Sequence, residues 1–238
     1  TSDVLNNGII SMNGADGCAV ANTPYNYYDN KRSTGGGAGG SVWLTTPHLH
    51  GSGIIRANGG STPRPIQLTG GAPLTTVGGT GGGGRIALYC SQSNYTGNIS
   101  AKSGNLDSMY TLMNIHKTQC GGGGTIYQNC GEEVDRLSID GSLTCPSPFP
   151  KQLFQNVSQL HLGALSLDKG SVLKMQDDQL PVAISVEDLT GDSSGGSMTL
   201  GRGQVLVVRG KLLNPDRSYD GKKISRPLPY TSASLTQE

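Results

Sequence analysis

The chain has 238 residues, of which 37 are glycine, while aromatic residues make up 5% and charged residues 15%. Its formal net charge is +1 and it contains no basic run, which excludes nucleic acid as a partner because a phosphate backbone requires clustered lysine and arginine. No stretch approaches the roughly eighteen apolar residues that a membrane span requires. The absence of an initiator methionine at Thr1 indicates a processed or partial chain.

A repeat organises the chain from its beginning. The unit consists of a glycine run, a short strand A, a turn, a strand B and a variable loop, and successive glycine runs are 44 and then 40 residues apart. The chain opens with the second half of a unit, and three complete units follow. In order they read NNGIISMNGADG (6–17); GAGGSVWLTT (37–46) with LHGSGIIRANGG (49–60); GGGGRIALYC (81–90) with NYTGNISAKSGN (94–105); and GGGGTIYQNC (121–130) with VDRLSIDGSL (134–143). Such a repeat predicts units that bury their apolar faces by stacking on one another.

Within the units the apolar residues follow the period of a β-strand. Ile86 and Leu88, for example, alternate with Ala87 and Tyr89, so one face of the strand is expected inside and the other outside. One loop insertion, at 106–119, could hold a short helix. Because the glycine runs keep a constant phase to strand A, they are predicted to form tight corners, where positive φ and close backbone approach exclude a Cβ.

Three regions are expected along the chain. Residues 1–148 form glycine-rich coils, and residues 149–213 continue as short strands without glycine runs. Residues 214–238 lose the strand pattern and form an extended, proline-punctuated polar tail. Strands spaced in this way suit either a sandwich or a solenoid, and the repeats of the first region favour the solenoid.

The succession GGGxGGS(I/V)xL, GxGxIxAxGG, GGGGRIAL and GGxGTIY, over roughly 35–145, is similar to the glycine-rich β-solenoid repeats of large secreted surface and cell-wall proteins. The resemblance implies an all-β fold, a right-handed parallel β-helix of the pectin-lyase-like type, with strands A and B in separate sheets. The alternative is a Greek-key sandwich. The resemblance to these repeats implies no particular activity, because enzymes, adhesins and fibre proteins share such folds.

Five cysteines fit no CxxC metal or redox pattern. Their polar, glycine-rich surroundings favour disulfides in a secreted protein, and the alternative is a set of ordinary reduced cysteines. Cys90 and Cys130 hold the same position in successive units, so strict stacking would bring their Cα atoms to about 5 Å, within disulfide range. Cys120 and Cys145 are the next candidate pair, which leaves Cys18 free. A local Cys120–Cys130 bond is the alternative pairing.

Three sequons, at Asn94, Asn98 and Asn156, predict at least one N-linked glycan if the host is eukaryotic. Their number is what chance would give in a chain of this composition. Their position says more, because Asn94 and Asn98 are expected in a turn ahead of a strand.

No residue pattern predicts a catalytic centre, a metal or a cofactor. The stretch GDSSGGS at 191–197 resembles the nucleophile motif of trypsin-like proteases, but no matching base or following helix accompanies it, so a turn is the better interpretation. His48 and His50 alternate, yet no third metal ligand is evident.

Aromatic side chains are the better candidates for a contact site. At one repeated strand position, Trp43 takes the place of Ala87 and Tyr127, on the side opposite to the isoleucines. Such a row suits a flat sugar or a partner surface, and the equal alternative is aromatics packed under a loop. The candidate residues are Trp43, Tyr89 and Tyr127 on strand A and Tyr25, Tyr27 and Tyr28 in a loop.

These observations predict a non-enzymatic structural protein of an extracellular assembly. A half unit without a cap and a reaching tail favour a head-to-tail fibre or cell-surface coat subunit, whose partners are copies of itself and glycans. The alternatives are a carbohydrate-binding adhesin and a polysaccharide-active β-helix enzyme. A fragment of a longer solenoid, capped by coils outside this chain, explains the same ends.

Overall fold

Only β-strands occur as regular structure in the residues that the computed structural model describes, which are 2–18, 34–63, 78–106, 120–131, 135–141, 159–168, 171–174, 183–191, 197–199, 205–210, 212–213 and 235–237. A ten-stranded sheet contains β1 (Val4–Leu5), β3 (Ser41–Gly51), β5 (Arg85–Tyr95), β7 (Gly124–Cys130), β8 (Arg136–Asp140), β9 (Gln159–Asp168), β11 (Ala183–Gly191), β13 (Val205–Val208), β14 (Leu212–Leu213) and β15 (Leu235–Gln237). A three-stranded sheet contains β2 (Ile9–Ser11), β4 (Ile54–Arg56) and β6 (Asn98–Ser100), and a two-stranded sheet contains β10 (Val172–Lys174) and β12 (Ser197–Thr199). The all-β prediction is confirmed.

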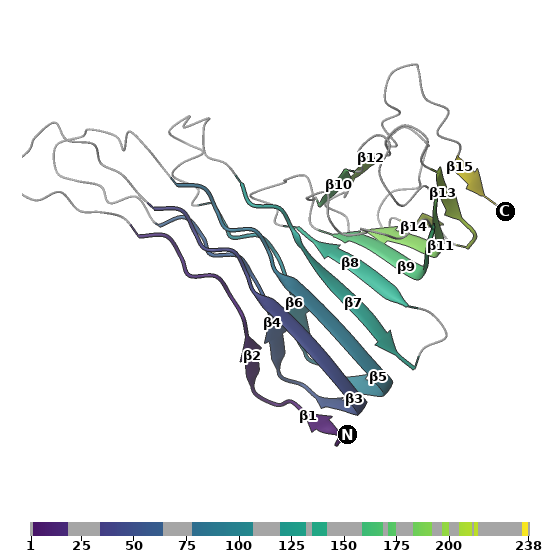
Figure 1. The fold of residues 1–238 in the computed structure, drawn as a ribbon, viewed down its shortest axis with the longest axis horizontal. Helices are drawn as coiled ribbons and strands as arrows, with labels where there is room; N and C mark the ends of the chain where they lie inside the picture. Colours follow the sequence, from purple (N-terminus) through teal and green to yellow (C-terminus); the bar gives the residue numbers. More distant parts are fainter. Residues whose placement is uncertain are drawn as a thin grey trace, which may run out of the picture.

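The first units stack in register, with strands A and B in separate sheets (Figure 1). Strands β3, β5 and β7 are parallel neighbours in the large sheet, and β2, β4 and β6 are parallel neighbours in the small sheet. Ile10, Ile55 and Ile99 occupy equivalent positions of the small sheet. Strands A and B therefore stack in separate sheets as far as β6, and the third strand B departs from this prediction.

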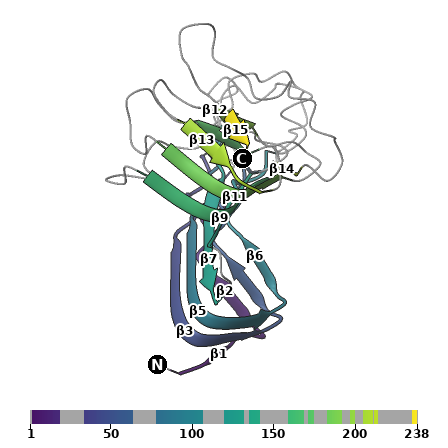
Figure 2. The same cartoon turned by 90° about the vertical axis from the view of Figure 1, so that its right-hand side faces the viewer.

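A first core fills the space between these two sheets. Figure 2 shows β3 and β5 on one side of this unit and β6 on the other. The alternation of the strands directs every second apolar side chain into the gap between the sheets. The buried side chains of this core are Leu49, Ile55, Ala57, Ile86, Leu88, Ala101 and Ile126.

The glycine runs form a bundle instead of corners. Six extended segments without strand pairing run side by side away from β2, β4 and β6 (Figure 1); we call them the glycine bundle, and they comprise residues 12–18, 34–40, 57–63, 78–84, 101–106 and 120–123. The N–H of Gly36 donates to the carbonyl of Gly79, and the N–H of Gly39 donates to the carbonyl of Gly82. Every third N–H of this segment therefore bonds to the same parallel neighbour. That period is the one of an extended helix with three residues per turn.

One central segment of the bundle bonds to four others. In segment 57–63, two N–H groups donate to neighbouring carbonyls: Gly59 to Lys102 and Gly60 to Gly37. Two carbonyls of the same segment accept from neighbouring N–H groups: Asn58 from Gly14 and Gly60 from Gly81. All four distances are 2.8 to 2.9 Å. A strand in a sheet has hydrogen-bonded neighbours on two sides only. The glycine bundle is therefore packed in three dimensions.

Close approach explains why these segments are glycine. A Cβ on Gly60 would overlap the carbonyl oxygen of Ala15, and a Cβ on Gly81 would overlap that of Gly37. Positive φ angles, by contrast, occur among the described glycines at Gly51 and Gly131, where β3 ends and just after β7. The prediction of corner glycines was right about close approach and wrong about corners.

The predicted right-handed parallel β-helix is wrong. Its third strand B, expected within 134–143, would have added to β6 of the small sheet. Instead Arg136–Asp140 is β8, which pairs antiparallel with β7 in the large sheet, so that sheet is mixed and no closed solenoid forms in the described residues. The reason is at the end of β8, where the buried carboxylate of Asp140 accepts the N–H of Ala101 at 2.9 Å, just after β6. The edge that a further strand B would use is thus partly occupied.

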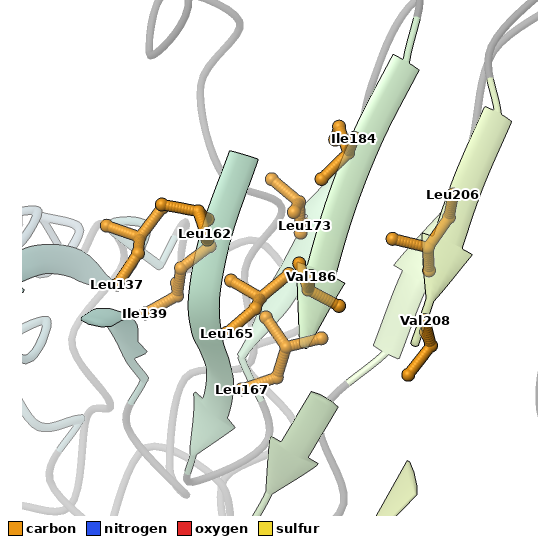
Figure 3. Packing of buried hydrophobic residues seen from close by; sticks show 10 residues of the cluster. All are labelled: Leu137, Ile139, Leu162, Leu165, Leu167, Leu173, Ile184, Val186, Leu206 and Val208. Carbon is orange, nitrogen blue, oxygen red and sulfur yellow. The ribbon is translucent and has the colours of Figure 1, made fainter. Parts of the chain in front are cut away.

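A second core lies on the opposite face of the large sheet. Cross-strand partners point to the same side, and the register sets Ile126 opposite Ser138 and Tyr127 opposite Leu137. Ile126 belongs to the first core, whereas Leu137 belongs to the second and Tyr127 packs against it. Figure 3 shows the buried side chains of the second core, Leu137, Ile139, Leu162, Leu165, Leu167, Leu173, Ile184, Val186, Leu206 and Val208.

A local irregularity in β9 keeps its apolar side chains on that face. The N–H groups of Gly163 and Ala164 both donate to the carbonyl of Asp135, an arrangement in which two consecutive residues oppose one partner, as in a β-bulge. Leu162 and Leu165 are consequently both buried in the second core, although their spacing is odd.

Cys90 and Cys130 form a disulfide, as predicted from their equivalent positions. Their Cα atoms are 4.1 Å apart on neighbouring strands. Cys120 is also disulfide-bonded, while Cys145, its predicted partner, lies outside the described residues. Cys18 is free and exposed, as expected.

The predicted tail and helix lie mostly outside the described ranges. Of the predicted helix, residues 107–119 are not among the described residues, and the same holds for residues 214–234 of the predicted tail. The end of the predicted tail, Leu235–Gln237, is the strand β15, which pairs in parallel with β13. This part of the tail is therefore not a free extension.

Substitution of Gly81 by alanine is predicted to destabilise the protein, because the new methyl would overlap the carbonyl of Gly37. We expect a loss of about 1–3 kcal/mol in the free energy of unfolding, the usual cost of overpacking. Gly82→Ala is the matched control from the same segment, since its nearest backbone atom would be at an ordinary 3.6 Å, and it should change stability by about 0.5 kcal/mol or less. Urea unfolding measures both. Equal losses in the two variants would contradict the packing described for the bundle.

Replacement of both Cys90 and Cys130 by alanine is predicted to lower the free energy of unfolding by about 2–4 kcal/mol, because the bond closes a loop of 40 residues in the unfolded chain. Thermal unfolding of this double variant and of Cys18→Ala provides the comparison. The Cys18 variant should match the unsubstituted protein, and non-reducing peptide mapping should recover the 90–130 link. A recovered 120–130 peptide would contradict the pairing.

Candidate functional site

Three of the six aromatic residues predicted from the sequence, Trp43, Tyr89 and Tyr127, lie together on the outer face of the large sheet. Trp43, Ala87 and Tyr127 are direct neighbours on β3, β5 and β7. Val42 and Leu44 pack against the first core, so the alternation turns Trp43 away from it. Tyr89 is on the same outer side, two residues along β5 from Ala87.

The three rings contact one another through Tyr89. The ring centroids of Trp43 and Tyr89 are 4.8 Å apart with an interplanar angle of 31°, and those of Tyr89 and Tyr127 are 5.5 Å apart at 51°. These are tilted contacts within the distances that aromatic pairs favour. Ala87 has no side chain beyond its methyl, so Tyr89 alone bridges the two outer rings. We call Trp43, Tyr89 and Tyr127 the aromatic row.

Trp43 is the exposed end of the aromatic row. Tyr127 is partly buried and packs against that core, Tyr89 is partly buried, and Trp43 is 72% exposed. Trp43 is also the sole tryptophan of the chain. Tyr127 thus packs against a core while Trp43 is open to solvent, and a contact role for these aromatics stays a prediction.

Polar contacts fix both ends of the row. The indole Nε1 of Trp43 donates to Oγ1 of Thr45 at 3.2 Å, and the hydroxyl of Tyr127 donates to Oδ2 of Asp135 at 2.6 Å. Burial raises the pKa of Tyr127 to about 12, and the hydrogen bond to Asp135 adds to the shift. Asp135 was not singled out from the sequence, because no motif links it to Tyr127 before β7 and β8 pair.

Other predicted site residues have separate locations. The side chains of Asn94, at the end of β5, and Asn98, in β6, are exposed, and their glycosylation stays a prediction. Asn156, Tyr25, Tyr27 and Tyr28 lie outside the described residues.

His48 and His50 lie beside the N-terminal residues Asp3 to Leu5. Nδ1 of His48 is 2.7 Å from Oδ1 of Asp3, and the rings of His48 and His50 stack with centroids 5.9 Å apart. Within the described residues, no group of three or more histidine, cysteine or acidic side chains could hold a metal ion.

The ionisation of Tyr127 is predicted to limit stability at high pH. The folded state raises its pKa from 10.0 to about 12, so the contribution of the protonated phenol is complete below about pH 10 and is lost as the pH rises through about 12. Ultraviolet difference titration should show the last phenolate step disappear in Tyr127→Phe. In Asp135→Asn the pKa of Tyr127 should move back toward 10.0, because the negative charge is gone. Burial also raises the pKa of Tyr95, which keeps its own step, so a late step of unchanged size in Tyr127→Phe would contradict the assignment.

Comparisons with protein-family models, with curated proteins and with solved structures found no match for this chain. Among the described residues, no helix is long and apolar enough to cross a membrane. What the aromatic row can do chemically therefore follows from its geometry.

Proposed function

We propose that this chain is a non-enzymatic structural protein of an extracellular assembly, in which copies of the chain join end to end. Two interior polar contacts support a structural role, because each holds parts of the framework together. The side-chain amide of Asn6 donates to the hydroxyl of Tyr95, and the carboxylate of Asp140 accepts from the backbone of Ala101. Both contacts connect segments that are far apart in the sequence.

The disulfide supports the extracellular location. Structural disulfides persist in oxidising compartments and are rare in the cytosol, and Cys90–Cys130 joins two neighbouring strands of the stack. The likeness of residues 35–145 to the glycine-rich repeats of secreted surface and cell-wall proteins points the same way. The exposed sequon residues Asn94 and Asn98 would carry glycans on the outside of such an assembly.

The observation that carries the proposal is the apolar outer edge of the stack. In the described part of the sheet path, β1 and β15 are the outermost strands, each paired on one side. The exposed large hydrophobic residues include Leu5 of β1 at 70% and Ile9 of β2 at 61%, together with Met12. Open strand edges template pairing with another chain, and two different edges that meet give a contact that propagates without closing.

Replacing Leu5 and Ile9 together by lysine is predicted to abolish self-association, because charges block an edge that is otherwise apolar. Sedimentation velocity and negative-stain microscopy over a range of concentrations should show growing oligomers for the unsubstituted chain and single particles for the double variant. The double variant Ser91→Lys/Ser93→Lys adds the same charge at exposed positions of β5 and should still associate. An unsubstituted chain that stays monomeric at every concentration would refute the proposal.

A further inference from the structure

We propose that the aromatic row is a binding site for an uncharged polysaccharide chain that lies across the strands β3, β5 and β7. This site is separate from the sheet edges through which copies of the chain are proposed to join. It rests on the outer face of the large sheet, where the one tryptophan of the chain is mostly exposed. Exposing this side chain to water needs a reason, because burying it would stabilise the fold.

The direction and length of the row suit a chain-like ligand. Trp43 and Tyr127 are two strands apart, with Tyr89 in contact with both rings. Two strand spacings correspond to roughly 10 Å, which accommodates more than one pyranose ring. The row runs perpendicular to the strands, so a ligand that follows it crosses the sheet.

The rings are held before any ligand arrives. The hydrogen bonds of Trp43 to Thr45 and of Tyr127 to Asp135 orient the two ends, and Tyr127 is anchored on the second core. A preorganised surface loses little conformational entropy on binding. This distinguishes the row from exposed aromatics on a loop.

The chemistry of the face matches a sugar. A pyranose presents an apolar face of C–H groups, which carry partial positive charge and are attracted to the negative face of an aromatic ring. Its rim presents hydroxyls, which need hydrogen-bond donors and acceptors on the same face of the sheet. Arg85, two residues before Ala87, and Thr45, two residues after Trp43, are exposed there. Rings with polar groups beside them are the arrangement that orients such an amphipathic ligand.

The charges beside the row favour an uncharged ligand. Arg85 is exposed on β5, and the carboxylate of Asp135 lies against the hydroxyl of Tyr127. Arg85 and Asp135 thus place one positive and one negative charge beside the rings in the part of the chain that the structure describes, and the whole chain carries a net charge of +1. No excess charge is present to attract an acidic polymer over long distances.

The size of the row argues against a protein as its occupant. A stable protein interface buries about 800 Å² on each partner. A large aromatic side chain buries about 150–250 Å² in full, and two of the three rings are already partly buried within the protein. The row thus offers a fraction of a protein interface but a complete platform for one or two sugar rings.

The test uses the fluorescence of the protein itself, since Trp43 is the only tryptophan and reports directly on the site. Soluble uncharged glucans, xylans and mannans are titrated into the full chain, and binding is measured independently by affinity electrophoresis in gels that contain each polymer. We expect at least one uncharged polymer to shift the emission and retard the protein, with little change at high salt. Polygalacturonate serves as the acidic comparison.

Trp43→Ala should weaken binding by about tenfold or more, as removal of a central aromatic anchor usually does, and Trp43→Phe should restore part of it. Because Trp43 is exposed, these variants should unfold at the same urea concentration as the unsubstituted chain, which separates loss of binding from loss of folding. Gln92→Ala, at an exposed position of β5 three residues beyond Tyr89, is the control and should bind normally. The proposal is overturned if no uncharged polymer binds, if only polygalacturonate binds and salt abolishes it, or if Trp43→Ala binds as tightly as the unsubstituted chain.

Discussion

Main-chain hydrogen bonds between glycine segments that touch without side chains are the constraint on which the rest of the structure depends. Gly37, Gly60 and Gly81 illustrate it, since the N–H of Gly60 donates to Gly37 and its carbonyl accepts from Gly81. The two units that contain β4 and β6 both enter and leave the glycine bundle, and β7 follows directly from it, so the bundle fixes where β3, β5 and β7 begin. The phase of the large sheet follows, and with it the neighbours Trp43 and Ala87 on β3 and β5.

The stack ends where β7 turns back into β8 and the large sheet changes its buried face. Ile126 points into the first core while Tyr127 points toward the second, so β7 belongs to both halves of the molecule. Asp140 completes the junction, because its buried carboxylate bonds to Ala101 beside β6. A strand of alternating apolar residues with both faces in use is what allows one sheet to connect two cores on opposite sides.

This change of face also explains the aromatic row. The outer side of β3, β5 and β7 is the same side that the second core covers further along the sheet, and the row runs from Tyr127, which is partly covered, to Trp43, which is open. Tyr127 therefore packs against the second core and still keeps part of its surface exposed for contact. The side chains on the inner face of these strands are buried in the first core. The outer face is therefore the one that a ligand can contact.

The sequence by itself determined the strands, their in-register stacking and the positions that stacking makes equivalent, because alternation and a fixed repeat spacing are local properties of the chain. The disulfide between Cys90 and Cys130 and the alignment of Trp43 with Tyr127 followed from that spacing. Only the tertiary structure decided how the glycine segments pack, because a residue without a side chain serves a corner and a bundle equally well. It also decided that Arg136–Asp140 turns back on β7 instead of extending the small sheet, since the partner of a short strand is chosen by contacts such as Asp140 with Ala101, and these join residues 39 positions apart.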